Sequence, residues 1–340
     1  YFDISIENAH RASADARATG QLFTYLIQEA LSRPLIILQK IDTLVKGTNI
    51  NNSNLFANII KTSIRMNTVD GLINAPSVYS PPENIFGGKK ITSLSKLPDS
   101  VIDWFSDDGL ICRNWKFYEK RLSQIDLIQD AYQAFSNGTI LVAEAGTGLG
   151  KSLAYLSSGY LSAKKKETSL VISTHTKNLQ SQLFEEDIPR LAQAIDQDIK
   201  AVIYKGRFNY ICKTRLERLM SNHNKILKAG EYEALISLLV WEWETQTGDI
   251  YECNGFQMNL YKRLWSLVRS ERGYCSKQRC SRHNSCYLGY LRDRVKEADI
   301  IIINHSLFAN ELQRDNTCLP EGFIYVIDEA HHFATVIRDQ

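Results

Sequence analysis

Apolar positions follow a helical spacing in the first part of the chain. Between residues 12 and 31 they recur every three or four positions, and Pro34 ends the pattern, which predicts one amphipathic helix. Residues 35–65 also have a helical pattern. Residues 66–100 contain four prolines with many Gly, Ser and Asn residues, a composition typical of a linker. We therefore expect a mainly helical N-terminal segment.

The pattern changes near residue 116, where short β-type runs begin to alternate with helical segments. The predicted strands are residues 140–143, 170–173, 201–204, 300–303 and 323–327. Strands that alternate with helices predict a parallel sheet of the α/β class.

Composition is that of a soluble globular protein with room for two or three domains. The 340 residues are 44% hydrophobic and 23% charged. No apolar run, such as residues 300–303, approaches the roughly 18 to 20 residues that a membrane span needs. The chain begins with Tyr1 and has no charged leader followed by an apolar stretch. We expect a monomeric, cytoplasmic fragment with no membrane partner.

Charge is unevenly distributed, although the net charge is only +2. Residues 257–296 hold ten Lys or Arg against two acids, a density suited either to a phosphate backbone or to a solvated face. Aromatic residues lie among these cations, and we infer a single-strand groove beside the cysteines, with a local core as the alternative for the aromatic rings. The residues concerned are Arg263, Arg269, Arg272, Lys277, Arg279, Arg282, Trp265, Tyr274 and Tyr287.

A phosphate loop is the strongest local pattern. It lies between the predicted strand 140–143 and the helical run 153–163, and consists of Ala145, Gly146, Thr147, Gly148, Leu149, Gly150, Lys151 and Ser152. Small residues let backbone amides face phosphate, Lys151 neutralises phosphate oxygens, and the Ser152 hydroxyl is a ligand for Mg²⁺. The alternative is a glycine-rich strand-to-helix turn that binds nothing.

A second acidic site follows the predicted strand 323–327. Asp328 is expected to hold Mg²⁺ and Glu329 to act as general base on the attacking water. Taken alone, the pair also fits the acidic first turn of a helix.

Five motifs occur in an order that resembles helicase domain 1 of the DinG family, relatives of XPD. They are residues 121–124, 145–152, 173–176, 304–307 and 328–331. The resemblance covers about residues 116–340 and implies a RecA-like parallel-sheet domain that uses ATP. Position 145 is Ala where the strict phosphate-loop pattern has Gly, as is common in superfamily 2 helicases, and position 122 is Leu where the family usually has Pro.

The resemblance also implies roles for individual residues. Arg121 and Gln124 would contact the adenine, and His331 would couple hydrolysis to strand movement. The residues expected on or near the nucleic-acid strand are Thr174, Thr176, Gln180, Asn304 and His305.

Cysteine spacing predicts a metal site. Cys275, Cys280 and Cys286 lie within twelve residues, and Cys212 completes a set of four thiolates. Zinc knuckles usually have closer pairs, but spacing alone leaves zinc and an iron-sulphur cluster both open. The resemblance implies a [4Fe-4S] cluster in a subdomain inserted at residues 205–290. We interpret Cys112, Cys253 and Cys318 as buried thiols, with Cys253 as the alternative to Cys212.

The N-terminal residues resemble a different family. His10 and Asp15 match the last motif of DEDDh 3'-5' exonucleases, in which His activates water and Asp binds a metal. Without that resemblance, the two residues fit a capping pair at a helix start. The earlier acidic motifs of the exonucleases do not occur in the chain.

These expectations define three segments. Residues 1–32 are an exonuclease remnant, residues 33–115 a helical segment and linker, and residues 116–340 a first motor domain, with a second motor domain expected outside the chain. The expected function is that of an ATP-dependent DNA helicase moving 5' to 3' on single strands and at duplex junctions. Two alternatives remain: an exonuclease with a helicase-like DNA platform, and a redox-responsive nucleic-acid binder.

Overall fold

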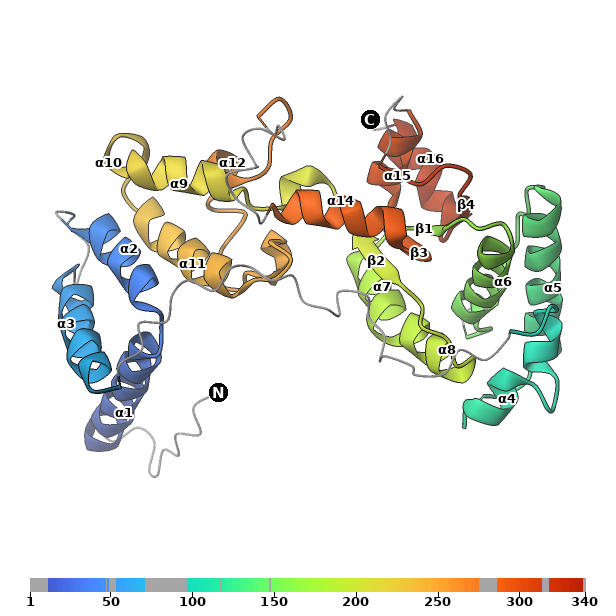
Figure 1. Cartoon of the computed structure of the whole chain (residues 1–340), viewed down its shortest axis with the longest axis horizontal. Coiled ribbons are helices and arrows are strands. Elements are labelled where there is room, and N and C mark those ends of the chain that lie inside the picture. Colours follow the sequence, from blue (N-terminus) through green and yellow to red (C-terminus); the bar gives the residue numbers. More distant parts are fainter. Residues whose placement is uncertain are drawn as a thin grey trace. The chain divides into compact units, whose positions relative to one another are not determined.

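The computed structural model describes residues 12–46, 48, 53–70, 97–116, 118–146, 148–274, 286–313 and 318–338. The chain forms two compact units (Figure 1). One, here called the sheet unit, comprises Pro81–Arg207 and Leu288–Gln340, and the other, the helical unit, comprises Tyr1–Ser80 and Phe208–Tyr287.

The sheet unit is built on four parallel strands. They are β1 (Leu170–Thr174), β2 (Ala201–Tyr204), β3 (Ile300–Asn304) and β4 (Ile324–Ile327), in the spatial order β2-β3-β1-β4. Ser173 of β1 lies opposite both Ile303 and Ile327, so three strands end at the same edge. The predicted α/β class with a parallel sheet is confirmed.

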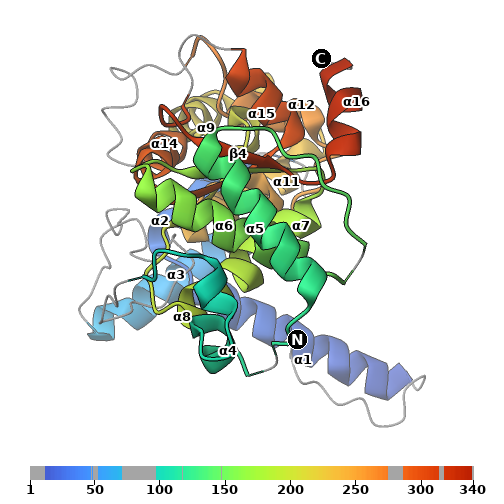
Figure 2. The same ribbon diagram turned by 90° about the vertical axis from the view of Figure 1, so that its right-hand side faces the viewer.

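Both faces of this sheet are covered, which explains the uninterrupted isoleucine run of β3. Ile300 and Ile302 pack into one core with helices α5 (Leu122–Asn137), α6 (Lys151–Lys165) and α8 (Ile188–Ala194). Ile301 and Ile303 pack on the opposite face against α14 (Tyr287–Glu297) and α15 (His305–Leu312). Helices α5 and α6 lie side by side (Figure 2).

Short elements complete the sheet unit. They are η1 (Ile102–Phe105), α4 (Leu110–Asn114), α7 (Lys177–Gln182), the π-helical turn η2 (Leu183–Asp187), η5 (Ala330–His332) and α16 (Phe333–Arg338).

The strand predicted at residues 140–143 is wrong. This segment pairs with none of the four described strands, and Ile140 and Val142 are 87% and 91% exposed. β-branched residues favour an extended backbone, but a strand forms only where a neighbour supplies ladder hydrogen bonds and a surface to pack on.

The helical unit joins residues far apart in sequence. Its elements are α1 (Ala12–Leu31), α2 (Leu35–Val45), α3 (Ser53–Asp70), η3 (Arg207–Asn209), α9 (Lys213–Ser221), α10 (His223–Ile226), α11 (Glu231–Glu244), η4 (Ile250–Glu252) and α12 (Lys262–Val268). Helix α2 packs beside α11 (Figure 1), where Ile37 and Leu44 share one core with Leu235 and Trp265.

The N-terminal helices agree with the sequence pattern in kind and differ in detail. Helix α1 has the predicted bounds, whereas the helical pattern of residues 35–65 divides into α2 and α3. Helix α3 continues to Asp70, inside the predicted linker, most of which lies outside the described residues. Within the described ranges, no helix combines the length and the apolar character that crossing a membrane requires.

Candidate nucleotide-binding site

The phosphate loop leads directly into helix α6. Gly148 and Gly150 have φ values of 81° and 83°, a left-handed conformation that glycine adopts without strain. Gly150 also has Gln124 against it, and a β-carbon at this position would overlap that side chain. Because α6 has 15 residues, its N-terminus presents free amides and a partial positive charge to the loop. Thr147 lies outside the described residues.

The two residues expected to contact adenine hold the loop in this structure. The buried Gln124 amide donates to the Gly150 carbonyl over 3.0 Å and accepts from the Tyr118 hydroxyl over 2.9 Å. Arg121 donates to the Gly148 carbonyl. Adenine contact stays a prediction for both residues.

Lys151 and Ser152 form the first turn of α6. Lys151 is half-buried and has no ion-pair partner among the residues that the structure describes. The Lys151 ammonium is therefore available to an anion. Ser152 lies one turn before Tyr155 on the same helix.

The second acidic site lies beside this helix. The Tyr155 hydroxyl of α6 donates to a carboxylate oxygen of Asp328 over 3.0 Å, at the end of β4. The Asp328 amide donates to the Ser173 carbonyl over 2.9 Å, which fixes the residue at the sheet edge. Burial, with the Asp328 charge, raises the pKa of Tyr155 well above its ordinary value, so the phenol keeps its proton as a donor. The helix after the phosphate loop and the acidic strand end are thus in direct contact.

Glu329, the residue after Asp328, has a left-handed backbone conformation. Its φ is 54°, and its amide donates to the Asp328 side chain over 2.9 Å. Both acids are half-buried, so a nucleotide or metal ion in front of them would be partly shielded from water.

Tyr155 and Asp187 were absent from the sequence prediction. Tyr155 lies three residues after Ser152, on the same helix face, and that spacing is the one sequence feature that identifies it. Asp187 ends the π-helical turn η2, and burial raises its pKa, an effect that the neighbouring Arg190 charge partly offsets. A π-helical turn has no simple sequence pattern, so the position of Asp187 could not be predicted.

The residues expected near nucleic acid are buried or cap a helix in this structure. Thr174, Gln180 and His305 are at most 3% exposed. The Thr176 hydroxyl caps α7 by accepting from the Leu179 amide over 3.3 Å, and the Asn304 side chain caps α15 in the same way. Nucleic-acid contact stays a prediction for all five residues.

His305 and His331 differ in exposure. The Nδ1 atom of the buried His305 is 2.7 Å from the Ser173 hydroxyl oxygen. Burial lowers the pKa of His305, and the neighbouring His175 lowers it further, so the ring is neutral near pH 7. His331 is exposed on η5, and its coupling role stays a prediction.

Cys212 lies beside residues 268–270, a segment that precedes the cysteine triplet in the sequence. It precedes α9, is 9% exposed, and donates its amide to the Val268 carbonyl over 2.8 Å. The Ser270 amide donates to Tyr210 over 2.7 Å, so the two segments run together five residues ahead of Cys275. Cys275 and Cys280 lie outside the described residues, and no group of three or more metal-binding side chains occurs within them.

Cys253 has a different environment. It packs in the apolar core of the helical unit, near Phe256, and burial raises the pKa of its thiol to about 11. An apolar setting that opposes the thiolate disfavours Cys253 as a metal ligand.

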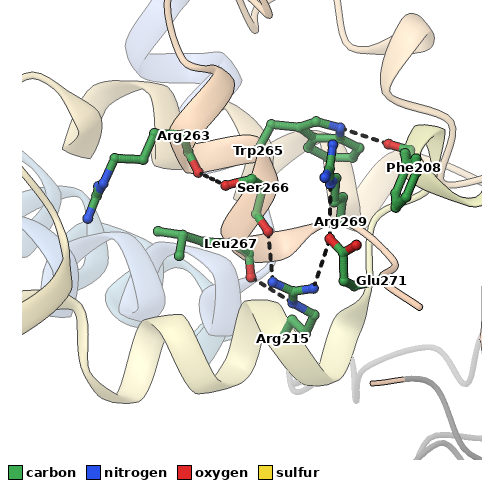
Figure 3. Close-up of polar contacts among 8 residues, drawn as sticks. All are labelled: Phe208, Arg215, Arg263, Trp265, Ser266, Leu267, Arg269 and Glu271. Carbon is green, nitrogen blue, oxygen red and sulfur yellow. Dashed lines mark hydrogen bonds and ion pairs between the residues drawn. The ribbon is translucent and has the colours of Figure 1, made fainter. Parts of the chain in front are cut away.

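The cations near the cysteines are largely held by protein groups. Figure 3 shows Arg215 donating to the Ser266 and Leu267 carbonyls over 2.7 and 3.0 Å, with Arg269 and Glu271 paired at 3.3 Å beside it.

Other members of the predicted groove are also structural. Arg263 forms an ion pair with Glu231 at 2.6 Å. Trp265 and Tyr287 are 3% exposed and lie in the core of the helical unit, so the local-core alternative holds for these two rings. Lys277, Arg279 and Arg282 lie outside the described residues.

Of the exonuclease pair, one residue can be placed. Asp15 is exposed in the first turn of α1, and His10 lies outside the described residues.

Comparison with known proteins gives relatives for most of the chain. No protein-family model matches it. It is 30% identical over 244 residues to "ATP-dependent DNA helicase YoaA" of Haemophilus influenzae, and 32% over 245 residues to the protein of that name in Escherichia coli. These matches cover 70% and 69% of the chain and 37% of each relative.

A third relative matches nearly the whole chain. "3'-5' exonuclease DinG" of Bacillus subtilis is 27% identical over 332 residues, which is 96% of the chain and 34% of that protein. The chain thus spans about a third of the length of these relatives, and in sequence it is similar to the DinG and YoaA proteins, whose names include an ATP-dependent DNA helicase and an exonuclease.

Proposed function

We propose that this chain is the ATP-binding part of a DinG-family ATP-dependent DNA helicase. The main support is the 3.0 Å hydrogen bond between Tyr155 and Asp328. Tyr155 lies on the helix that follows the phosphate loop, and Asp328 lies at the end of β4. It supports one site in which the loop and the acids serve the same nucleotide. The helicase names of the relatives agree with this proposal.

Each residue has a task in this proposal. The loop amides and the Lys151 ammonium bind the β- and γ-phosphates, and Glu329 accepts a proton from the attacking water. Mg²⁺, when bound, neutralises charge that develops on the phosphates, and Ser152 and Asp328 are the residues that would hold it. The Tyr155–Asp328 hydrogen bond supports this assignment, because Tyr155 lies one turn after Ser152 on α6 and joins that helix to the Asp328 carboxylate.

The experiment is ATP hydrolysis by the full-length protein with and without single-stranded DNA. Lys151→Ala should abolish nucleotide binding and hydrolysis, and Glu329→Gln should retain binding while hydrolysis falls by at least a hundredfold. A Lys151→Ala protein that hydrolyses ATP at the normal rate would contradict the proposal. Lys164→Ala, on the far end of α6, is the matched control.

The direction of movement is proposed from the family resemblance as 5' to 3'. Duplexes with a 5' or a 3' single-stranded tail separate the two directions. Unwinding of the 5'-tailed substrate alone is expected, and unwinding from the 3' tail would contradict the assignment while leaving the ATP site unaffected.

We further propose a [4Fe-4S] cluster held by Cys212, Cys275, Cys280 and Cys286. The pairing of residues 210–212 with residues 268–270 supports this set, because it brings Cys212 beside the segment that enters the triplet. A cluster in this position would stabilise the helical unit. Anaerobic purification followed by iron, sulphide and zinc counts tests the assignment, and zinc in place of iron would overturn it.

A second candidate activity is 3'-5' exonuclease in the full-length protein. It is favoured by the relative from Bacillus subtilis, whose match extends over 96% of this chain, including the N-terminal helices. His10 and Asp15 would then belong to the end of that nuclease domain. Degradation of 3' ends that persists in Lys151→Ala and stops in Asp15→Asn is the expected result.

A further inference from the structure

Histidine rings join the end of β1 to the turn that carries Glu329. The two strands β1 and β4 pair in parallel, so the residues that follow them emerge at the same edge of the sheet. His175 follows β1 and His332 ends η5, and their rings are stacked with centroids 4.1 Å and planes 18° apart. The segment expected to bind a nucleic-acid strand therefore touches the segment that carries the catalytic acids.

His332 is also bound to the Glu329 backbone. Its amide donates to the Glu329 carbonyl over 2.9 Å, which closes the short turn between them. Glu329 has φ 54° and ψ 46°, a left-handed conformation that is unfavourable for any residue other than glycine. Neighbouring contacts must hold this backbone in place, and the hydrogen bond from the His332 amide, whose ring is stacked on His175, is one of them.

The outer ring of the stack reaches the surface. His175 is exposed, in the same turn as Thr176 and Lys177 at the start of α7. On its inner side lies the buried His305 ring, with centroids 5.9 Å apart. A polymer lying along this turn meets His175, and His175 cannot move inward without displacing a packed ring.

We propose that the His175–His332 stack transmits nucleic-acid occupancy of the β1 exit turn, defined here as residues 175–177, to the backbone of Glu329. This inference rests on the proposed helicase function. A single strand on the turn shifts the His175 ring, the stacked His332 ring follows, and the hydrogen bond from His332 changes the position of Glu329. In this proposal both histidines are positioning residues that act through the Glu329 backbone.

Coupling of this kind is reciprocal. If the strand changes the nucleotide site, nucleotide must change the affinity for the strand by the same factor. The stack therefore makes a prediction for binding as well as for hydrolysis, and binding can be measured even in a variant whose hydrolysis is lost.

The test compares His175→Ala, His332→Ala and His332→Phe with the unsubstituted full-length protein. The measured quantity is the ratio of ATP hydrolysis with single-stranded DNA to hydrolysis without it. This ratio should fall at least fivefold in both alanine variants, the lower end of the usual range for coupling between sites, and should be largely retained in His332→Phe, which keeps a stacking ring. The double alanine variant should lose no more than either single variant.

A second measurement follows DNA affinity by fluorescence anisotropy of a labelled single-stranded oligonucleotide, with and without a non-hydrolysable ATP analogue. The analogue should change the affinity of the unsubstituted protein and change that of His175→Ala much less. Normal stimulation of ATP hydrolysis by DNA in His175→Ala would overturn this inference but not the helicase proposal. Losses that multiply in the double variant would do the same. An unsubstituted protein whose hydrolysis ignores DNA would overturn the inference and the helicase proposal together.

Discussion

Tyr155 and Asp328 are joined by a 3.0 Å hydrogen bond that links helix α6 to the end of β4. Removing this hydroxyl in Tyr155→Phe should leave the fold intact and loosen Asp328. We expect the Mg²⁺ concentration for half-maximal ATP hydrolysis to rise severalfold, with a loss of about 1 kcal/mol in unfolding free energy. Magnesium titrations and thermal unfolding measure the two effects.

The same helix offers a matched control. Tyr160 is 1% exposed, and its hydroxyl has no hydrogen-bond partner among the described residues. Tyr160→Phe should therefore leave the magnesium requirement unchanged and unfold at the same temperature or higher. Equal magnesium shifts in both variants would show that the Tyr155 hydroxyl has no special role.

Gly150 should not tolerate a side chain. Its φ of 83° is strained for alanine, and an added β-carbon would also displace Gln124. Gly138 is strained in the same way, with φ 67°, but has open space around it. Gly150→Ala should weaken ATP binding at least tenfold, whereas Gly138→Ala should cost about 1 kcal/mol of stability with normal ATP binding. Calorimetric titration with ATP distinguishes them.

Arg215 should be essential to the helical unit. Its guanidinium, 16% exposed, is held by two carbonyls and lies 3.7 Å from the Glu271 carboxylate (Figure 3). Arg215→Ala should lower the unfolding free energy by about 2 kcal/mol, because hydrogen bonds involving charged groups are strong and two partly buried carbonyls lose their donor. The exposed Arg218 on the same helix provides the control, and its substitution by alanine should change stability by less than about 0.5 kcal/mol.

The two buried cysteines of the helical unit should separate cluster assembly from packing. Cys212→Ser is expected to abolish iron binding if Cys212 is a ligand. Cys253→Ser should keep the iron, since burial holds the pKa of that thiol near 11, and lose only packing stability. Iron and sulphide counts, with visible absorbance, measure the difference. Iron loss confined to Cys253→Ser would reverse the ligand assignment.

Local patterns predicted the buried strands because β1, β2 and β3 are enclosed on both faces, and that burial requires apolar runs. The segment at residues 140–143 has the same composition but no ladder partner, and partners are a property of the tertiary structure. The packing of Ile37 against α11 could not be predicted from the sequence. Helical spacing shows which face of a helix is apolar, but not which element packs against that face.

In the candidate site, too, some residues could be predicted from the sequence and others depend on tertiary structure. The order and spacing of the motifs predict Lys151, Ser152, Asp328 and Glu329 as site residues, and these roles stay predictions. Tyr155 and Asp187 could not be predicted, because their places depend on tertiary structure. Tyr155 contacts Asp328 at the end of β4, and Asp187 is placed by a π-helical turn. The sequence alone does not show whether an aromatic residue such as Trp265 is buried in a core or exposed to stack on a base. Its burial becomes known only from the folded structure.

His305 should make stability depend on pH. Burial and the neighbouring His175 lower its pKa from the ordinary 6.5, so the unfolded chain binds a proton here more readily than the folded chain. The stability that His305 contributes is present above pH 6.5 and is lost as pH falls through the lower, folded-state pKa. Thermal unfolding between pH 8 and pH 5 should therefore show a steeper fall in the unsubstituted protein than in His305→Gln, whose amide does not titrate and still reaches Ser173. Parallel curves would show that protonation of His305 does not contribute to the acid sensitivity of the fold.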